Sequence, residues 1–519
     1  MAEQNTELTN LELEAGSEWR FELEGDENMA VRTLSQGSVL INSEEINPTT
    51  WYPIHRYTKA AIYAPSPARL QVANMPASQY TSSPTNQPQL INIHLALERE
   101  RILAKRGQGS APRVMVIGQA NAGKTTVVKN LVNMALGSGL GWTPGVVGLD
   151  PASPPNLIPG SISLSTPSHT LPTHHIAHPL GAPSTSTAGN TLSGNVETLA
   201  WWLGTNEPTS KNLEVWKLLV RNLADAWEKR CQQDKNAAVS GLFVDTSSAF
   251  TVPSLSKKKD DHTPPYSLVT DAVQALDIDT ILIIGNEKLQ IGISRLPLLQ
   301  ARGTTVIRLP KSDGAVDLDD AYRSLAHSFI VRTYFYGEPP LPPQISSLVG
   351  KMVGLDSELT PYSFQIPWYR LSVMRVGEEN TAPSSALPLG SSKVVSPTRL
   401  VKVDPSGPGH VVRLLNTVLA LVQVKKEDWL NPEEMKEEKE EHDGEGAEGT
   451  EGEVKEEEQE DEDDEVPYKE EIGTREVLGF IVITAIDTVK KKYTVLSPSP
   501  GKLPSTVAIA GHIEWVDSA

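Results

Sequence analysis

The residue pattern with the most specific chemistry lies at residues 118–125, which read Gly-Gln-Ala-Asn-Ala-Gly-Lys-Thr. It matches the phosphate-binding P-loop, G-x-x-x-x-G-K-[ST], at every fixed position, with an apolar run before it and a helical pattern after it. The glycines let backbone N–H groups surround a phosphate, and the N-terminus of the following helix adds a favourable field. We expect Lys124 to reach the β- and γ-phosphates, Thr125 to place its hydroxyl on Mg²⁺, and Thr126 to contact the α-phosphate.

Two aspartates that end apolar runs are candidates for the second part of a Mg²⁺ site. Asp150 follows the run 146–149, and Asp245 follows the run 242–244. A carboxylate at the C-terminal end of a strand beside a P-loop can hold Mg²⁺ through water. Asp150 is the first candidate and Asp245 the competing one, while a helix N-cap is the ordinary alternative for either residue.

Other residues that could do chemistry have simpler interpretations. Four histidines fall within ten residues, but the segment is rich in Pro and Thr and has no Cys or carboxylate beside them, so a solvated loop is favoured over a metal site: His169, His174, His175 and His178. The run Lys257-Lys258-Lys259 indicates a charged surface turn rather than a nuclear signal. Cys231 has no obvious His partner, which favours an unreactive thiol.

The composition of the 519 residues points to a folded protein with one strongly acidic insert. The net charge is −19, yet the segment from Glu427 to Glu471 alone holds 24 acidic and 4 basic residues, so the rest is nearly neutral. This excludes a strongly basic, histone-like nucleic-acid binder. The single cysteine excludes a disulfide framework, and no apolar run of membrane-spanning length or signal peptide is present, so we expect an intracellular, non-membrane protein.

The apolar pattern predicts an α/β fold in which a central P-loop NTPase-like parallel sheet is flanked by two other domains. Short, continuously apolar runs that alternate with helical segments are typical of strands buried on both faces of a parallel sheet. We predict an N-terminal β-sandwich domain at residues 1–90, the central domain at 91–335, and a small C-terminal α+β domain at 336–519 with a disordered acidic insert at 427–471. Residues 76–88 are expected to form a linker, and residues 160–197 a long loop.

Three segments taken together resemble the Clp-type polynucleotide 5′-hydroxyl-kinase family. They are Glu18-Trp19-Arg20-Phe21-Glu22, the P-loop at Gly118, and Leu309-Pro310-Lys311-Ser312-Asp313-Gly314. Residues 239–246, 334–337 and 493–498 match as well, in family order over nearly the whole chain. Members of this family are subunits of the mRNA 3′-end cleavage and polyadenylation machinery, including the fungal subunit of cleavage factor IA.

The resemblance implies a set of ATP-binding residues that composition alone would not identify. In the family the N-terminal domain clamps the adenine, and by position the residues for this are Glu18 and Lys59. The phosphate-binding residues transfer onto the P-loop itself: Asn121, Ala122, Gly123, Lys124, Thr125 and Thr126. Mg²⁺ would be held by Thr125 and Asp150.

Two departures from the active family pattern bear on catalysis. Kinase-active members follow the strand-terminal Asp with a Gly-Gln pair that helps to orient the attacking hydroxyl, whereas residues 150–155 read Asp-Pro-Ala-Ser-Pro-Pro. Active members also carry a lid arginine just after the segment that ends at Gly314. Here acidic residues follow, at Asp317, Asp319 and Asp320, and Arg323 comes several residues later. Fungal members show this Asp-Pro replacement and keep ATP as a structural ligand.

We therefore predict a nuclear, ATP-binding subunit of the pre-mRNA 3′-end cleavage and polyadenylation factor, needed for endonucleolytic cleavage. ATP with Mg²⁺ would be structural, and no catalytic residue is assigned. The expected partner is the scaffold subunit of the complex, with RNA contacted at most indirectly. The alternative is an active RNA 5′-hydroxyl kinase. A GTPase is disfavoured because the sequence lacks the N/T-K-x-D guanine motif.

Overall fold

The computed structural model describes most of the chain and divides it into two compact units. The described residues are 7–34, 38–154, 157–177, 180, 198–255, 264–337, 339–350, 360–377, 397–403, 405–406, 413–430 and 467–517. One unit comprises residues 1–200, 205–207 and 223–361, and the other comprises 201–204, 208–222 and 362–519. Within the described part of the chain, no helix is both long and apolar enough to cross a bilayer.

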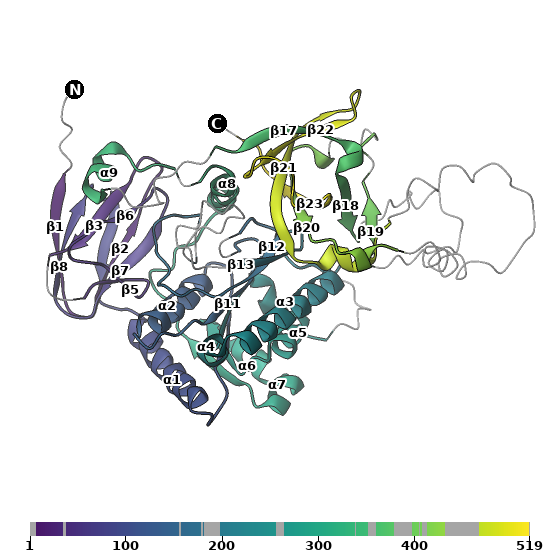
Figure 1. The fold of residues 1–519 in the computed structure, drawn as a ribbon. Helices are drawn as coiled ribbons and strands as arrows, with labels where there is room; N and C mark the ends of the chain where they lie inside the picture. The colour runs from purple at the N-terminus through teal and green to yellow at the C-terminus, as the bar shows by residue number, and fades with distance from the viewer. Residues whose placement is uncertain are drawn as a thin grey trace, which may run out of the picture. The chain divides into compact units, whose positions relative to one another are not determined.

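The first unit begins with a β-sandwich (Figure 1). One sheet has the order β1 (Leu8–Leu13), β8 (Ala68–Ala73), β3 (Met29–Thr33), β6 (Tyr52–Ile54). The other has the order β5 (Glu44–Glu45), β4 (Leu40–Ile41), β7 (Lys59–Ala64), β2 (Ser17–Glu22), β9 (Ser78–Ser82). Trp19 and Leu70 are among the fully buried residues of its core. The expected sandwich is confirmed, but the linker prediction for 76–88 is wrong at β9, whose polar residues pair with β2.

The same unit contains most of the predicted α/β domain, apart from residues 201–204 and 208–222. Its sheet has the order β13 (Thr198–Trp202), β12 (Ser161–Ser165), β11 (Gly145–Leu149), β14 (Leu242–Thr246), β10 (Arg113–Ile117), β15 (Thr280–Ile284), β16 (Thr305–Leu309). The five strands from β11 to β16 run parallel, as continuous apolar runs predict. β12 pairs antiparallel with β11, so the loop prediction for 160–197 is wrong at these residues. Residues 181–197 lie outside the described part of the chain.

Helices cover the parallel sheet and fix the direction of the P-loop (Figure 1). They are α1 (Gln87–Lys105), α2 (Lys124–Gly137), α3 (Leu213–Gln233), α4 (Lys235–Ser240), α5 (Ser267–Leu276), α6 (Glu287–Ser294) and α7 (Pro297–Arg302). A further helix, α8 (Asp320–Tyr336), buries Phe329 and Ile330 in a separate cluster beside Tyr57 of the sandwich. Val128 and Leu131 of α2 are fully buried in one core cluster with Val114 and Val116 of β10. Because this apolar face of α2 packs on the sheet, the N-terminus of the helix stays at the carboxyl end of β10.

A short helix after the α/β domain packs on the sandwich. α9 (Pro343–Val349) buries Ile345 against Ala30 and Ala73, and Leu341 joins the same cluster. The sequence placed these residues in the C-terminal domain at 336–519. They instead extend the core of the N-terminal sandwich, because apolar side chains of this short segment meet an apolar face there.

The second unit is built on a seven-stranded sheet. Its order is β17 (Tyr362–Pro367), β22 (Lys492–Ser497), β21 (Val477–Asp487), β20 (Thr417–Val422), β23 (Val507–Glu514), β18 (Ser372–Val376), β19 (Leu400–Lys402). All neighbouring pairs are antiparallel except β18 and β23. Leu419, Ile481 and Val495 are fully buried in its core.

Both ends of the predicted disordered insert are structured. The 3₁₀ helices η3 (Lys426–Asp428) and η5 (Glu470–Thr474) flank it. Asp428 is buried and forms an ion pair with Arg475, and the ring centroids of Trp429 and Tyr468 lie 4.6 Å apart. The prediction of disorder over 427–471 is therefore wrong at these ends, where a paired charge and aromatic packing stabilise the chain. Residues 431–466 lie outside the described part.

Candidate nucleotide-binding site

The P-loop connects β10 to α2 in the backbone conformation that phosphate binding requires. Asn121 and Gly123 both have left-handed backbone angles, with φ of 59° and 85°. A Cβ atom on Gly118 would lie 3.1 Å from the Cβ of Ala122, so a residue larger than glycine would crowd the loop there. Lys124 folds back over the loop, and its Nζ donates to the backbone oxygen of Gln119 at 3.1 Å. Successive N–H groups of such a loop form an anion-binding concavity.

The hydroxyl of Thr125 contacts Asp245. Its Oγ1 donates to Asp245 Oδ2 at 2.6 Å, because β14 lies beside β10 and pairs Val116 with Asp245. Asp245 is fully buried, and its Oδ1 has no hydrogen-bond partner among the described residues. The pKa of Asp245 is raised to about 7, mainly by burial. The nearby charge of Asp150 also raises this pKa, whereas the hydrogen bond from the Thr125 hydroxyl lowers it. The competing candidate of the sequence is thus the carboxylate that contacts the P-loop threonine.

Asp150 lies on the neighbouring strand end and faces the same space. It follows β11, and its Oδ1 accepts a hydrogen bond from the backbone N–H of Ala152 at 3.1 Å. Burial raises the pKa of Asp150, and the charges of Lys124 and Arg323 lower it. One hydroxyl and two carboxylates are the hard oxygen ligands that Mg²⁺ prefers, and the orphan Oδ1 of Asp245 adds a buried acceptor. The residues present therefore fit a Mg²⁺ ion bound with a nucleotide.

Arg323, which the sequence places several residues after the expected lid position, reaches the P-loop. Asp319 caps α8 by accepting from the N–H of Tyr322 at 2.7 Å, which places Arg323 in the first turn of the helix. Its guanidinium donates to the side-chain oxygen of Asn121 in the P-loop. The predicted acidic lid has another explanation, since Asp319 is a cap and Asp317 forms an exposed ion pair with Lys311. An N-cap signal followed four residues later by Arg is the pattern that could have identified this cation.

The sandwich supplies the two residues that the resemblance implied. Glu18 on β2 is buried, and its Oε2 accepts from Arg20 Nε at 3.0 Å and Nη2 at 2.9 Å. Its other oxygen accepts from the hydroxyl of Thr85. Lys59 on β7 forms an ion pair with Glu22, and its Nζ lies 5.3 Å from the ring centroid of Tyr322 on α8.

One cavity of about 850 Å³ brings these residues together. Its lining includes seven sequence-predicted residues and three that the structure adds: Glu18, Lys59, Asn121, Ala122, Gly123, Thr125, Thr126, with Arg20, Tyr322 and Arg323. Asp150 lines it as well, whereas Lys124 is buried with its amine on the loop backbone. A volume of several hundred Å³ that is partly apolar and carries convergent polar groups is typical of a cofactor-sized site.

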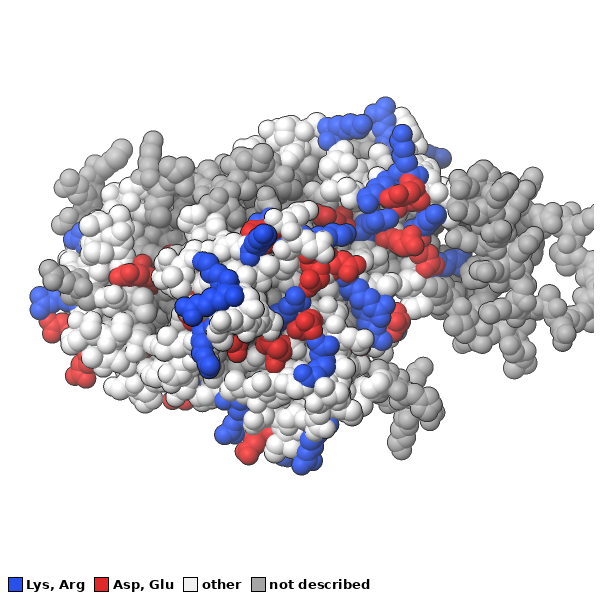
Figure 2. All heavy atoms as spheres, turned by 60° about the horizontal axis from the view of Figure 1, so that its bottom comes forward, with Lys and Arg blue, Asp and Glu red and all other residues white. Residues whose placement is uncertain are grey.

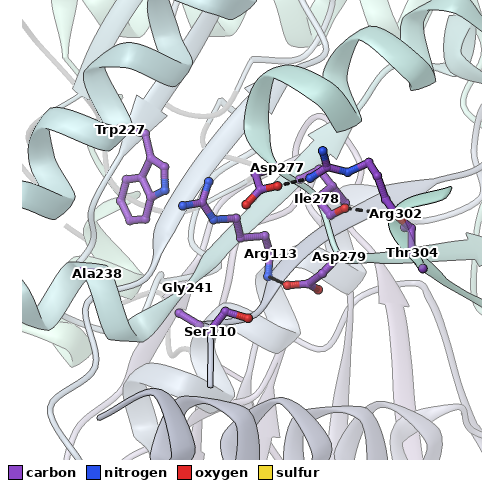
Figure 3. A pocket seen from close by; sticks show the side chains of 12 residues that line it. Ser110, Arg113, Trp227, Ala238, Gly241, Asp277, Ile278, Asp279, Arg302 and Thr304 are labelled. Carbon is purple, nitrogen blue, oxygen red and sulfur yellow. Dashed lines mark hydrogen bonds and ion pairs between the residues drawn. The ribbon is translucent and has the colours of Figure 1, made fainter. Parts of the chain in front are cut away.

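A second pocket, drawn in Figure 3, lies at the amino-terminal ends of the parallel strands, whereas the P-loop follows the carboxyl end of β10. It has a volume of about 260 Å³. Two of its lining residues, Arg302 and Asp277, form an ion pair, and Arg113 forms an ion pair with Glu228, which is not part of the lining. The backbone N–H of Arg113 also donates to Asp279 at 2.9 Å. The Oδ1 of Asp279 has no hydrogen-bond partner among the described residues, but a pocket of this size is smaller than the usual ligand site, so the large cavity is the candidate.

The structure describes several of the remaining sequence candidates, and His175 is one of the residues that line the cavity. His174 and His175 are buried, so the prediction of a solvated loop is wrong for them; the ring Nδ1 of His174 lies 2.7 Å from Pro53 O. No group of three or more His, Cys, Asp or Glu among the described residues could hold a metal ion by itself. Burial raises the pKa of Cys231 to about 11, as expected for an unreactive thiol. His178 and the lysine run 257–259 lie outside the described residues.

On the face shown in Figure 2, Lys and Arg side chains are interspersed with Asp and Glu. An extended basic stripe, the usual electrostatic signature of a nucleic-acid interface, is not visible among the described residues of that view.

Comparison with known families gives matches along the chain. The N-terminal beta-sandwich domain of polyadenylation factor matches residues 12–104, and the mRNA cleavage and polyadenylation factor CLP1 P-loop matches 118–337. The pre-mRNA cleavage complex II protein Clp1 matches residues 359–517.

Individual proteins agree with the family matches. The mRNA cleavage and polyadenylation factor CLP1 of Cryptococcus neoformans var. neoformans is 68% identical, over 100% of both chains. The polyribonucleotide 5′-hydroxyl-kinase Clp1 of Danio rerio is 25% identical, over 98% of this chain and 94% of that protein. The solved structure of a Clp1p–Pcf11p complex has a TM-score of 0.72 at 21% identity, over 99% of both chains, which shows the same fold.

Proposed function

Because the chain belongs to the Clp1 family of mRNA cleavage and polyadenylation factors, we propose that it is an ATP-binding subunit of the pre-mRNA 3′-end cleavage machinery whose nucleotide is structural. The observation that carries the proposal is the single cavity lined by a P-loop on one side and by Glu18 and Lys59 of the sandwich on the other. A nucleotide that fills it touches two domains of one compact unit.

Each end of this cavity matches a different part of Mg²⁺-ATP. The N–H groups of Asn121 to Thr126 and the start of α2 suit the phosphates. Thr125 and Asp245 would hold Mg²⁺, with Asp150 reaching it through water, and Lys124 would exchange its bond to Gln119 O for a phosphate oxygen. Bound Mg²⁺ would neutralise part of the phosphate charge. Glu18 and Lys59 are the proposed adenine-side residues.

A ligand that joins two domains stabilises them by mass action. At millimolar ATP and micromolar affinity, RT ln(1 + [L]/Kd) is about 4 kcal/mol, a large part of the stability of an ordinary domain. ATP therefore needs no turnover to be useful, because the surfaces that it holds in place would be those that meet the scaffold subunit.

The segment after Asp150 is the reason to favour binding without turnover. In Asp150-Pro151-Ala152-Ser153-Pro154, the N–H of Ala152 bonds to the Asp150 carboxylate and the N–H of Ser153 bonds to the Asp150 backbone oxygen at 3.2 Å. The buried Pro154 can neither donate a hydrogen bond nor adopt a free loop geometry. The segment offers no amide side chain to orient a hydroxyl. The second candidate, an RNA 5′-hydroxyl kinase, is supported by Arg323 at the phosphate end and by the name of the Danio rerio relative.

The proposed partner is the scaffold subunit of the cleavage factor, and the proposed location is the nucleus, where pre-mRNA is processed. Solved relatives of the same fold are complexes of Clp1p with Pcf11p. Co-purification of the chain with this subunit from nuclei, and impaired 3′-end cleavage after depletion, are the expected results. A free monomer with normal cleavage after depletion would contradict this part of the proposal.

One purification tests the nucleotide proposal. The full chain, purified without added nucleotide and then denatured, should release intact ATP in about equimolar amount. Incubated with γ-labelled ATP and a 5′-hydroxyl RNA oligonucleotide, it should transfer no label above background. An empty site would overturn the structural-ligand proposal, and label transfer that is lost in Asp150→Ala would establish the kinase instead.

A further inference from the structure

A tight turn of the sandwich is inserted against the helix that carries the P-loop. The hairpin of β4 and β5 turns through Asn42 and Ser43, whose φ angles are 46° and 62°. Two successive left-handed residues define the tight type I′ hairpin turn, in which Asn is favoured. Turns of this kind ordinarily extend into solvent, yet Asn42 and Ser43 are both half-buried.

Helix α2 receives the turn with two buried asparagines. Ser43 Oγ donates to Asn130 Oδ1 at 2.6 Å, and Asn133 Nδ2 donates to the backbone oxygen of Asn42 at 2.9 Å. Asn130 and Asn133 are both buried, and their spacing of three residues places them on one face of the helix. These bonds join the sandwich to the α/β domain within one compact unit.

A third segment closes the arrangement into a network. Asn133 Oδ1 accepts from the N–H of Leu171 at 2.7 Å, and its Nδ2 also donates to Leu171 O at 3.1 Å. Asn42 Nδ2 donates to Thr173 Oγ1 at 2.9 Å. Apolar packing tolerates sliding of one surface over another, whereas a buried and satisfied polar network fixes one arrangement.

This network connects the two ends of the nucleotide cavity through rigid elements. On the α2 side, Asn130 and Asn133 lie roughly 9 to 14 Å along the helix from Lys124. On the sandwich side, β4 pairs with β7, the strand of Lys59, and β7 pairs with β2, the strand of Glu18. A shift of the turn on α2 would therefore change the separation between the adenine-side residues and the P-loop.

We propose that Asn42 and Ser43 are positioning residues for ATP: their bonds to α2 and Thr173 set the distance between the adenine-binding and phosphate-binding halves before the nucleotide arrives. The inference rests on the proposed function of the cavity. When two halves of a ligand bind two preset halves of a site, the second contact is effectively intramolecular, and this advantage is lost if the spacing is wrong. A ligand that touches only one half gains nothing from the spacing.

The test compares ATP with a ligand that fills only the phosphate half. The double variant Ser43→Ala/Thr173→Val removes two bonds across the junction and leaves α2 unchanged. Ser43→Ala keeps a Cβ atom at this positive φ, so it adds no backbone strain. The matched control is Thr49→Val, which removes a hydroxyl bond to Asn47 at 2.6 Å within the sandwich alone. Affinities for Mg²⁺-ATP and for Mg²⁺-tripolyphosphate are measured by calorimetry on the nucleotide-free full chain.

The double variant should bind ATP about tenfold more weakly and tripolyphosphate within about twofold of the unmodified chain, while Thr49→Val changes neither. This split separates positioning from a general loss of structure, which would weaken both ligands. Unchanged ATP affinity in the double variant, or an equal loss for tripolyphosphate, would overturn the inference and leave the proposed function intact. Failure of the unmodified chain to bind ATP would overturn both.

Discussion

Neutralising the buried carboxylate beside Thr125 should raise the stability of the nucleotide-free chain and weaken its binding of the nucleotide. Asp245 is fully buried, accepts one hydrogen bond from Thr125, and leaves its Oδ1 without a partner. Asp245→Asn removes the charge and keeps an oxygen that can accept from the Thr125 hydroxyl. We expect the nucleotide-free variant to be more stable than the unmodified chain and to respond less to Mg²⁺-ATP.

The size of the effect follows from the pKa of this group. A rise from 3.8 to about 7, caused mainly by burial, corresponds to about 4 kcal/mol of stability lost once Asp245 is ionised. The amide of Asn adds unpaired donors, which cost about 1–3 kcal/mol. The net gain for the nucleotide-free variant at pH 8 is therefore about 1–3 kcal/mol.

The pH dependence has a definite sign. Because the folded state holds the proton of Asp245 more tightly than the unfolded state, the unmodified chain loses stability as pH rises from about 4 to about 7. The variant has no such loss at this position. Its advantage should be small at pH 5 and fully present at pH 8.

Thermal unfolding at pH 5 and pH 8, with and without Mg²⁺-ATP, measures all of these quantities. Asp279→Asn is the matched control, because burial also raises the pKa of Asp279 but this residue lies at the amino-terminal ends of the parallel strands. It should leave the stabilisation by Mg²⁺-ATP unchanged. An Asp245→Asn variant that is no more stable at pH 8, or whose advantage is equal at both pH values, would refute the electrostatic argument.

Four further changes test separate parts of the site. Lys124→Ala should abolish ATP retention and the ATP-dependent rise in melting temperature; stoichiometric ATP in the purified variant would contradict the P-loop assignment. Arg323→Met should weaken ATP about tenfold, since a charge-assisted bond contributes about 1.5–3 kcal/mol, whereas Arg308→Met, which removes an exposed ion pair with Glu287, should have no effect on binding. Deletion of residues 433–464 should leave melting temperature and ATP content unchanged, because so charged a segment buries little apolar surface; a loss of several degrees would show that it packs on the fold. Ser153→Gln, which puts an amide on a half-buried residue of the cavity, should give detectable label transfer to 5′-hydroxyl RNA if orientation of the hydroxyl is the missing element.

The sequence predicted those parts of the fold and site that depend on local patterns. Continuous apolar runs gave β10, β11, β14, β15 and β16, and the fixed spacing of the P-loop placed Lys124 and Thr125. β9 was missed because its five residues are polar and none is fully buried. Its strand character comes from pairing with β2, which is a long-range effect.

Features that depend on the order of strands or on distant contacts could not be predicted from a single sequence. Asp150 and Asp245 both end apolar runs, and only the sheet order shows that β14, not β11, is the immediate neighbour of β10. The contact of Ser43 with Asn130 likewise joins residues 87 positions apart. No local pattern distinguishes a hairpin turn that meets solvent from one that meets a helix.

The position of Arg323 gives this chain one feature of a phosphoryl-transfer enzyme, a cation beside the P-loop. The sequence suggested two deficits, an absent orienting Gln and an acidic lid, but Asp319 caps α8 and the first turn of this helix brings a guanidinium to the P-loop. A cation at the phosphate end is thus present, and charge stabilisation is one of the two requirements of the reaction. The case for a structural ATP therefore depends on the segment after Asp150, whose backbone N–H groups already bond to Asp150 and whose proline fixes the loop. We therefore expect a site that holds the phosphates and supplies a cation, but does not orient the attacking hydroxyl, to retain ATP without consuming it.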